Sequence, residues 1–156
     1  SWKELLILAK DIPVDVRFLE LMPIGEGKEG ETISNTTLFQ KIKEIYPDIK
    51  PDERKHGNGP AIYYKIPGFE GSIGFISAIH GVFCDSCNRL RMTSTGELKP
   101  CLCYDETISV RDVARCGDSE KIRENIKHAI QIKPKKHCFS EIEKVSEKKK
   151  MAQIGG

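Results

Sequence analysis

The stretch that decides the fold of this chain is residues 84–103, which read CDSCNRLRMTSTGELKPCLC. A three-residue loop at 94–96 can join two antiparallel strands, because Gly96 tolerates the left-handed conformation that such a loop needs at its last position. The loop therefore predicts a β-hairpin whose register pairs Thr93 with Glu97, Arg91 with Lys99 and Arg89 with Cys101.

The two faces of this hairpin would differ in chemistry, because side chains along a strand alternate between faces. One face would carry cysteines and cations: Cys87, Arg89, Arg91 and Cys101. The other face would be apolar and would point into a core: Leu90, Met92, Leu98 and Leu102. A two-residue turn would shift the register and mix these faces.

The cysteine spacing within the stretch predicts a metal centre. Cys84 and Cys87 form a C-x-x-C motif, whose turn brings two thiolates to one side, and Cys101 follows after thirteen residues. With Cys103 as a fourth ligand, these residues could bind a structural zinc ion tetrahedrally, and spacing alone favours zinc. Alternatively, Cys84, Cys87 and Cys101 could hold an iron–sulfur cubane and leave one iron open.

The two arginines on the predicted metal face favour an iron–sulfur site that binds substrate over a structural zinc site. A structural zinc site gains nothing from unpaired cations beside it, whereas planar guanidinium groups match the oxygens of phosphate or carboxylate. Arg89 and Arg91 are therefore candidate ligands of a polyanionic substrate. The alternatives are a solvent-exposed strand face or compensation of thiolate charge.

Upstream of the hairpin, the sequence predicts an α/β pattern. A strand at 14–22 has apolar residues on both faces, as in a parallel sheet that is covered on both sides, and it follows a helix at 3–10. A polar loop follows at 25–34. A helix follows, with Thr37 and Gln40 as its capping box and with Leu38, Ile42 and Ile45 on one face. Two strands are then predicted at 61–66 and 72–76, separated by Pro67-Gly68.

Downstream of the hairpin, two helices are predicted at 110–115 and from 119 onward. Ser119 would cap the second helix, whose buried face would carry Ile122, Ile126, Ala129 and Ile130. We expect the basic end of the chain to be mobile.

Composition restricts the class of protein. The 156 residues are 31% charged and 38% hydrophobic with a net charge of +2, which is typical of a globular domain and too small to indicate a nucleic-acid surface. No apolar run could span a bilayer or serve as a signal peptide, so we expect a cytoplasmic protein. In that compartment the six cysteines are expected to be metal ligands or free thiols rather than disulfides, with Cys116 and Cys138 as unliganded thiols.

The sequence resembles the GTP 3′,8-cyclase family of molybdenum-cofactor biosynthesis. The segments 83–93 and 96–102 are very similar to the family's signature. Residues 17–25 resemble the family's last barrel strand and the loop after it, and residues 74–77 resemble the stretch before the signature. Residues 133–137 and 154–156 resemble the family's tail.

This resemblance implies a fold of class α+β. Residues 1–25 would be the last helix and strand of an incomplete (βα) radical-SAM barrel. Residues 26–150 would form a C-terminal α/β iron–sulfur domain with a metal-bearing β-hairpin, and residues 151–156 a Gly-Gly tail.

The resemblance also implies the roles of individual residues. Cys84, Cys87 and Cys101 would hold a [4Fe–4S] cluster whose open iron meets the guanine of GTP. Arg89, Arg91 and Arg17 would bind GTP, and the tail residues Gly155 and Gly156 would reach into the active site as catalytic residues. In the family reaction, a 5′-deoxyadenosyl radical abstracts the C3′ hydrogen of GTP, and the resulting radical attacks C8 of the guanine.

Two departures from the family pattern restrict this implication. The chain contains no C-x-x-x-C-x-x-C motif for the cluster that cleaves S-adenosylmethionine, so that cofactor would belong only to the full-length enzyme and the chain alone would be inactive. Its partners would be GTP, the missing N-terminal half and a second copy in a homodimer, without membrane or nucleic acid. Cys103 also stands where the family more often has an aromatic residue, which keeps a stand-alone zinc-binding interaction module as the alternative.

Overall fold

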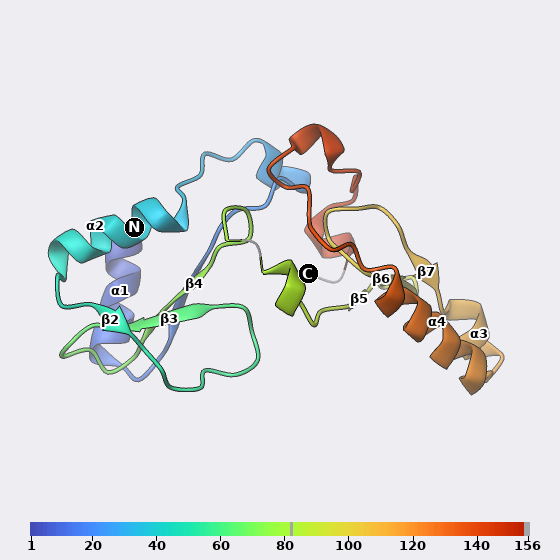
Figure 1. Ribbon diagram of the computed structural model, residues 1–156, viewed down its shortest axis with the longest axis horizontal. Coiled ribbons are helices and arrows are strands. Elements are labelled where there is room, and N and C mark those ends of the chain that lie inside the picture. Colours follow the sequence, from blue (N-terminus) through green and yellow to red (C-terminus); the bar gives the residue numbers. More distant parts are fainter. Residues whose placement is uncertain (82, 155–156) are drawn as a thin grey trace. The chain divides into compact units, whose positions relative to one another are not determined.

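The computed structural model describes residues 1–81 and 83–154, which fall into two compact units (Figure 1). Unit 1 comprises Ser1–Leu21 and Glu31–Phe83, and unit 2 comprises Met22–Gly30 and Cys84–Gly156. Both units combine helices with strands, so the predicted α+β class is confirmed. The predicted boundaries at 25 and 150 stay a prediction. None of the described helices is long and apolar enough to cross a membrane.

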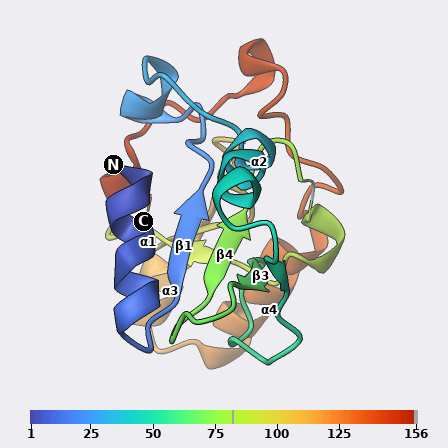
Figure 2. The same cartoon turned by 90° about the vertical axis from the view of Figure 1, so that its left-hand side faces the viewer.

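Unit 1 contains one four-stranded sheet and two helices (Figure 2). The strand order is β1-β4-β3-β2, in which β1 and β4 are parallel and the other two pairs are antiparallel. The elements are α1 (Trp2–Asp11), β1 (Val16–Leu19), α2 (Asn35–Ile45), β2 (Lys50–Pro51), β3 (Ile62–Lys65) and β4 (Ile73–Ile76).

One face of this sheet carries the core of unit 1. In the β1–β4 register, Val16 lies opposite Ile73 and Phe18 opposite Phe75, so these four side chains share a face. That face packs against the apolar side of both helices, which contribute Leu6, Ala9, Leu38 and Ile42 to the same cluster. The two helices therefore cover the same face of the sheet.

The other face of β1 differs from its prediction. A strand buried on both sides was expected, but burial alternates along β1, and Leu19 is 55% exposed. The physical reason is that both helices of the unit pack on the side of Val16 and Phe18. The prediction placed this strand in a parallel sheet without naming a partner; β1 is parallel to β4, and the other two strand pairs of the sheet are antiparallel.

The start of α2 also differs from its prediction. Ser34, not Thr37, is the N-cap, and its hydroxyl accepts a hydrogen bond from the backbone N–H of Thr37 at 3.1 Å. The helix therefore starts one turn earlier than the predicted capping box, because a serine hydroxyl satisfies a free N–H group of the first turn. Leu38 and Ile42 are buried as predicted, whereas Ile45 is exposed.

Unit 2 is built on a three-stranded antiparallel sheet of order β5-β6-β7, with β7 absent from the prediction. Its strands are β5 (Arg91–Met92), β6 (Glu97–Lys99) and β7 (Ile108–Ser109), followed by α3 (Arg111–Arg115) and α4 (Ser119–Gln131). Four 3₁₀ turns complete the unit: η1 (Gly25–Lys28), η2 (Cys84–Ser86), η3 (Ile142–Lys144) and η4 (Met151–Gln153).

The hairpin turns as predicted. Gly96 has a φ of +81°, and Arg91 pairs with Lys99 in the β5–β6 ladder. The ladder ends at that pair, so the predicted pairing of Arg89 with Cys101 is wrong.

The predicted apolar face of the hairpin is correct only in part. Leu98 is buried with Leu90 packed against its cluster, but Met92 is 56% exposed. The helix α4 packs mainly on β6 and β7, and Met92 lies on the edge strand β5.

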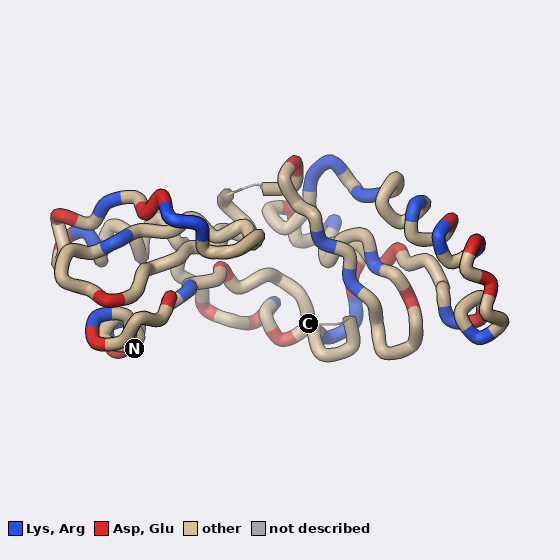
Figure 3. Tube along the Cα trace, turned by 90° about the horizontal axis from the view of Figure 1, so that it is seen from below, with Lys and Arg blue, Asp and Glu red and all other residues tan. Residues whose placement is uncertain are grey.

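The helix α4 has a different cap and a narrower buried face than predicted. Asp118, not Ser119, is its N-cap, and its carboxylate accepts the backbone N–H of Lys121 at 2.9 Å. Ala129 is fully buried, whereas Ile126 and Ile130 are exposed. Lysines and glutamates alternate along this helix in Figure 3, which gives it the solvated outer face of an amphipathic helix.

The basic end of the chain is folded as far as it is described, contrary to the expectation of a mobile end. Val145, Glu147 and Ile154 are buried, and η4 forms between the last two. Lys150 forms an ion pair with Glu26 at 2.6 Å, which joins this segment to η1. The apolar residues among the lysines supply the burial that composition alone does not indicate.

A buried carboxylate joins three segments of unit 1. Glu20 follows β1 directly and accepts hydrogen bonds from the backbone N–H groups of Asn35, Ile79 and His80 and from the His80 ring, at 2.8–3.1 Å. Burial alone would raise the pKa of Glu20, but these hydrogen bonds together hold it below its usual range. Glu20 therefore ties the end of β1 to the start of α2 and to the chain after β4.

We predict that Glu20→Gln lowers the free energy of unfolding at neutral pH by about 1–3 kcal/mol, because an amide NH₂ would face a backbone donor. The folded pKa of Glu20 lies below its ordinary value of 4.5. The stability that the carboxylate contributes is therefore present above that pH and is lost as the pH falls through the folded pKa. Urea unfolding should show the parent and the variant converging in acid, with the exposed Glu44→Gln as the matched control. Equal stabilities at neutral pH would contradict this role.

Candidate metal centre

Cys84 and Cys87 lie on one tight turn of unit 2. The turn η2 begins at Cys84, and the backbone N–H of Cys87 donates to the carbonyl oxygen of Cys84 at 3.1 Å. Both thiols are free and half-buried. The local hydrogen bond thus presents two reactive sulfurs from one four-residue segment.

Cys101 supplies a third thiol from the other arm of the hairpin. It directly follows Pro100 and is also free and half-buried. Burial raises the pKa of the Cys101 thiol and Cys84 and Cys87 raise it further, whereas the backbone N–H of Cys103 and the Lys133 ammonium lower it. Cys84 and Cys87 therefore lie close enough to act on the Cys101 thiol. Over residues 1–81 and 83–154, no three His, Cys, Asp or Glu side chains are placed as ligands of a single metal ion.

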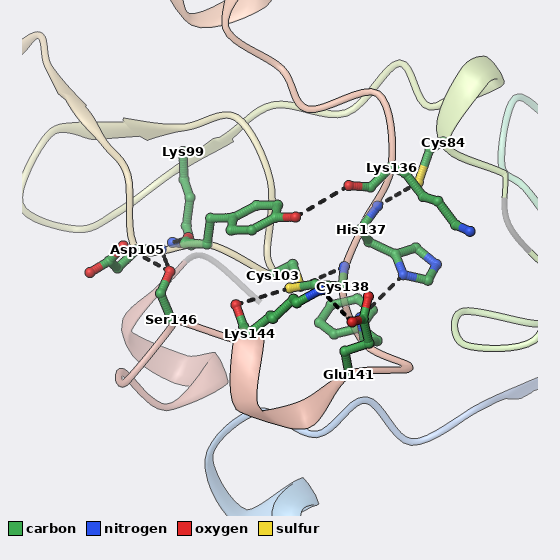
Figure 4. The surroundings of a disulfide bond; sticks show 12 residues. Cys84, Lys99, Cys103, Asp105, Lys136, His137, Cys138, Glu141, Lys144 and Ser146 are labelled. Carbon is green, nitrogen blue, oxygen red and sulfur yellow. Dashed lines mark hydrogen bonds and ion pairs between the residues drawn. A yellow bond between two sulfur atoms is a disulfide. The ribbon is translucent and has the colours of Figure 1, made fainter.

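Hydrogen-bond donors surround these sulfurs. The Nζ atom of Lys133 lies 3.8 Å from the Sγ atom of Cys87, and the backbone N–H of His137 donates to the Sγ atom of Cys84 at 3.3 Å (Figure 4 shows the second contact). Donors and cations stabilise a thiolate more than a thiol. The segment 133–137 therefore places a donor at two of the three sulfurs.

The imidazole of His137 adds a buried donor to this segment. Its Nδ1 atom accepts the backbone N–H of Phe139 at 3.3 Å, so the ring proton belongs on Nε2. Burial lowers the pKa of His137, and the charge of Lys136 lowers it further, which keeps the ring neutral. Within the described part of the chain, the buried Nε2 atom has no hydrogen-bond partner.

Cys103 and Cys138 form a disulfide bond, contrary to the expectation that all six cysteines are ligands or free thiols (Figure 4). The bond links the segment after Cys101 to the segment after His137. Sequence spacing could not predict it, because the two cysteines are 35 residues apart and only folding brings them together. Cys103 is consequently not a free fourth thiolate for zinc, whereas Cys116 is free and exposed.

A cavity of about 190 Å³ borders Cys101 within unit 2. Its walls are partly polar and partly apolar: Pro100, Cys101, Tyr104, Glu106, Ile132 and Pro134. One of the three thiols therefore lies beside an open space that a small group could enter.

The predicted substrate-binding arginines are found in both units. Arg89 is exposed and Arg91 half-buried in unit 2, close along the chain to Cys87. Arg17 lies in unit 1 on the exposed face of β1, where it pairs with Gly74. A Cβ atom at Gly74 would lie 3.0 Å from the Cγ atom of Arg17, so the glycine leaves room for this side chain. Gly155 and Gly156, the predicted catalytic tail, lie outside the described residues.

Sequence reasoning missed three residues around the thiols: Lys133, His137 and Glu147. The first two belong to a segment that was recognised only as part of the family tail. Glu147 forms a buried ion pair with Lys99, for which the sequence predicted only the strand pairing with Arg91. No short-range pattern indicates such partners, because each contact joins segments more than 30 residues apart.

Comparison with known proteins places the chain in a family. Residues 14–139 match the family described as Molybdenum Cofactor Synthesis C. The chain belongs to this family. The match includes the three candidate ligand cysteines and the segment 133–137.

Individual relatives agree with the family. The chain is 45% identical over 154 residues to a GTP 3′,8-cyclase of Clostridium perfringens, covering 98% of this chain and 48% of the relative. It is 40% identical over 152 residues to a GTP 3′,8-cyclase of Alkaliphilus metalliredigens, covering 96% and 46%. A GTP 3′,8-cyclase of Petrotoga mobilis is 38% identical over 151 residues, with the same two coverages. The chain thus spans about half the length of the curated relatives it matches.

The cysteine assignment of this family member predicts a thiol count. In non-reducing denaturant, an alkylating agent should label four cysteines (Cys84, Cys87, Cys101 and Cys116), and prior reduction should add Cys103 and Cys138. Peptide mass spectrometry would identify the labelled sites. In the Cys138→Ser variant, Cys103 should become labelled without reduction. Labelling of Cys103 in the unreduced parent would show that the disulfide does not form.

Proposed function

We propose that this chain is the substrate-side part of a GTP 3′,8-cyclase and that Cys84, Cys87 and Cys101 bind a [4Fe–4S] cluster. The observation that carries the proposal is the set of three free, half-buried thiols in unit 2 with donors at two of the sulfurs. When bound, such a cluster supplies an iron without a cysteine ligand, to which a substrate base can bind.

The residues around the thiols fit this group. Thiolates carry the negative charge that the Lys133 ammonium and the His137 amide favour. The unpartnered Nε2–H of His137 offers a further donor from the same segment. The cavity beside Cys101 leaves room on one side of the site.

A zinc-binding interaction module is the second candidate. Its four-thiolate form needs Cys103 as a ligand, and the disulfide with Cys138 occupies that sulfur. The family relationship also favours the cluster. Zinc therefore ranks second.

In the proposed mechanism, this chain binds and orients GTP. Arg89 and Arg91 contribute two cations next to the cysteine turn, and Arg17 contributes a third from β1. We propose that α1 and β1 are the last helix and strand of the radical-SAM barrel. The Gly155-Gly156 tail approaches the substrate through its backbone, because glycine has no side chain to exclude it. Positioning and charge compensation are the contributions of such residues. Generation of the radical from S-adenosylmethionine belongs to the other half of the enzyme, so the chain alone should be inactive.

The cluster is tested by anaerobic reconstitution with iron and sulfide. We expect about four irons per parent chain and a brown chromophore. Cys84→Ala, Cys87→Ala and Cys101→Ala should each lose both, because each removes one of only three ligands. Cys116→Ala, a free and exposed cysteine, is the control and should retain them. A chromophore that survives Cys101→Ala would refute the ligand set, and uptake of one zinc with no iron would favour the interaction module.

Substrate binding is tested by titrating the reconstituted chain with GTP. Charge-assisted hydrogen bonds contribute about 1.5–3 kcal/mol each, so Arg89→Ala or Arg91→Ala should weaken binding by roughly ten- to a hundredfold. The iron content should stay constant. Arg115→Ala, at the exposed end of α3, should bind GTP as the parent does. If both arginine variants lost the cluster as well, the arginines would compensate thiolate charge instead.

A further inference from the structure

The two arms of the hairpin are not paired with each other where they carry the cysteines. The β5–β6 ladder ends at Arg91 and Lys99, before either arm reaches Cys87 or Cys101. Backbone pairing therefore does not set the separation of these two sulfurs. Another interaction has to connect the arms.

Lys133 makes this connection. Its ammonium donates to the carbonyl oxygen of Arg89 at 2.8 Å and to that of Pro100 at 3.0 Å. Arg89 follows Cys87 by two residues, and Pro100 directly precedes Cys101. One cation thus binds the backbone of both arms at the level where the ladder has ended.

The same ammonium brings a positive charge to the sulfurs. Its Nζ atom lies 3.8 Å from the Sγ atom of Cys87. The side chain is half-buried, so water screens this charge less than at an exposed lysine. Three thiolates held together repel one another, and a cation at this distance offsets part of that repulsion.

The backbone of Lys133 is itself held in place. It lies two residues after the end of α4, and its N–H donates to the carbonyl oxygen of Ile130 at 3.3 Å. The helix α4 packs on β6 and β7 and buries Ala129 against Leu98 and Val110. The lysine therefore extends from a rigid element of the same sheet that carries the hairpin.

We infer that Lys133 is a positioning residue of the proposed cluster site, which joins the two cysteine-bearing arms and neutralises part of the thiolate charge. This inference rests on the proposed function. It predicts two separable effects: a looser hairpin in the metal-free chain, and a cluster that is more labile and harder to reduce. The second effect follows because nearby positive charge favours the more negative, reduced state of a cluster.

The experiment compares the parent with Lys133→Met, Lys133→Arg and Lys135→Met. Methionine removes the charge and both hydrogen bonds at similar volume, arginine retains the charge and can restore donors, and Lys135 is an exposed lysine of the same segment. Amide hydrogen exchange on the metal-free chains should show faster exchange at 87–91 and 99–102 in Lys133→Met alone. Far-UV circular dichroism checks that each variant is folded.

The same variants are then reconstituted anaerobically. In Lys133→Met, loss of iron to a chelator should be at least about tenfold faster, because two charge-assisted hydrogen bonds are lost, and the reduction potential should be more negative. Lys133→Arg should lie between the two, and Lys135→Met should match the parent. A parent that takes up no iron would refute the proposed function, while the exchange data would still test the connection between the arms. Unchanged exchange, or a Lys133→Met cluster with the parent's lability and potential, would overturn the inference.

Discussion

Unit 2 depends on one buried ion pair, between Lys99 and Glu147. Their side chains are 1% and 2% exposed, and removing such charges from water costs several kcal/mol for each ion unless they are paired. Lys99 also donates to the carbonyl oxygen of Tyr104, and Glu147 accepts the backbone N–H of Lys149. Burial would raise the pKa of Glu147, but the hydrogen bond and charge of Lys99 together with the backbone N–H groups of Lys149 and Lys148 hold it below its usual range. The pair therefore locks the end of β6 to the C-terminal segment.

The candidate metal centre lies next to the Lys99–Glu147 ion pair along the chain. Lys99 is separated from Cys101 only by Pro100, so the pair restrains the backbone that presents the third thiol. The Cys103–Cys138 bond then joins this segment to the residue after His137, whose amide contacts Cys84. A chain of covalent and polar contacts thus connects all three cysteines with the C-terminal segment.

Unit 1 uses a buried carboxylate in a comparable way. Glu20 accepts hydrogen bonds from N–H groups at the start of α2 and beyond the end of β4. At these places the helix and the sheet leave backbone donors without a partner of their own. Both units thus hold their loops with single acidic side chains in the interior. Each of these groups stabilises the fold only while it is ionised, so both units should lose stability in acid.

The sequence by itself determined the α+β class, the strand that begins the first sheet, the hairpin turn at Gly96 and the three candidate cysteine ligands. These follow from short-range rules: side-chain period, glycine conformation and ligand spacing. Only the tertiary structure decided that Cys103 pairs with Cys138, that Lys99 is buried against Glu147, and that Lys133 donates hydrogen bonds to both arms of the hairpin. Each of these contacts joins residues more than 30 positions apart. Their partners are selected by the packing of α4 and the C-terminal segment on the sheet, which no local pattern encodes.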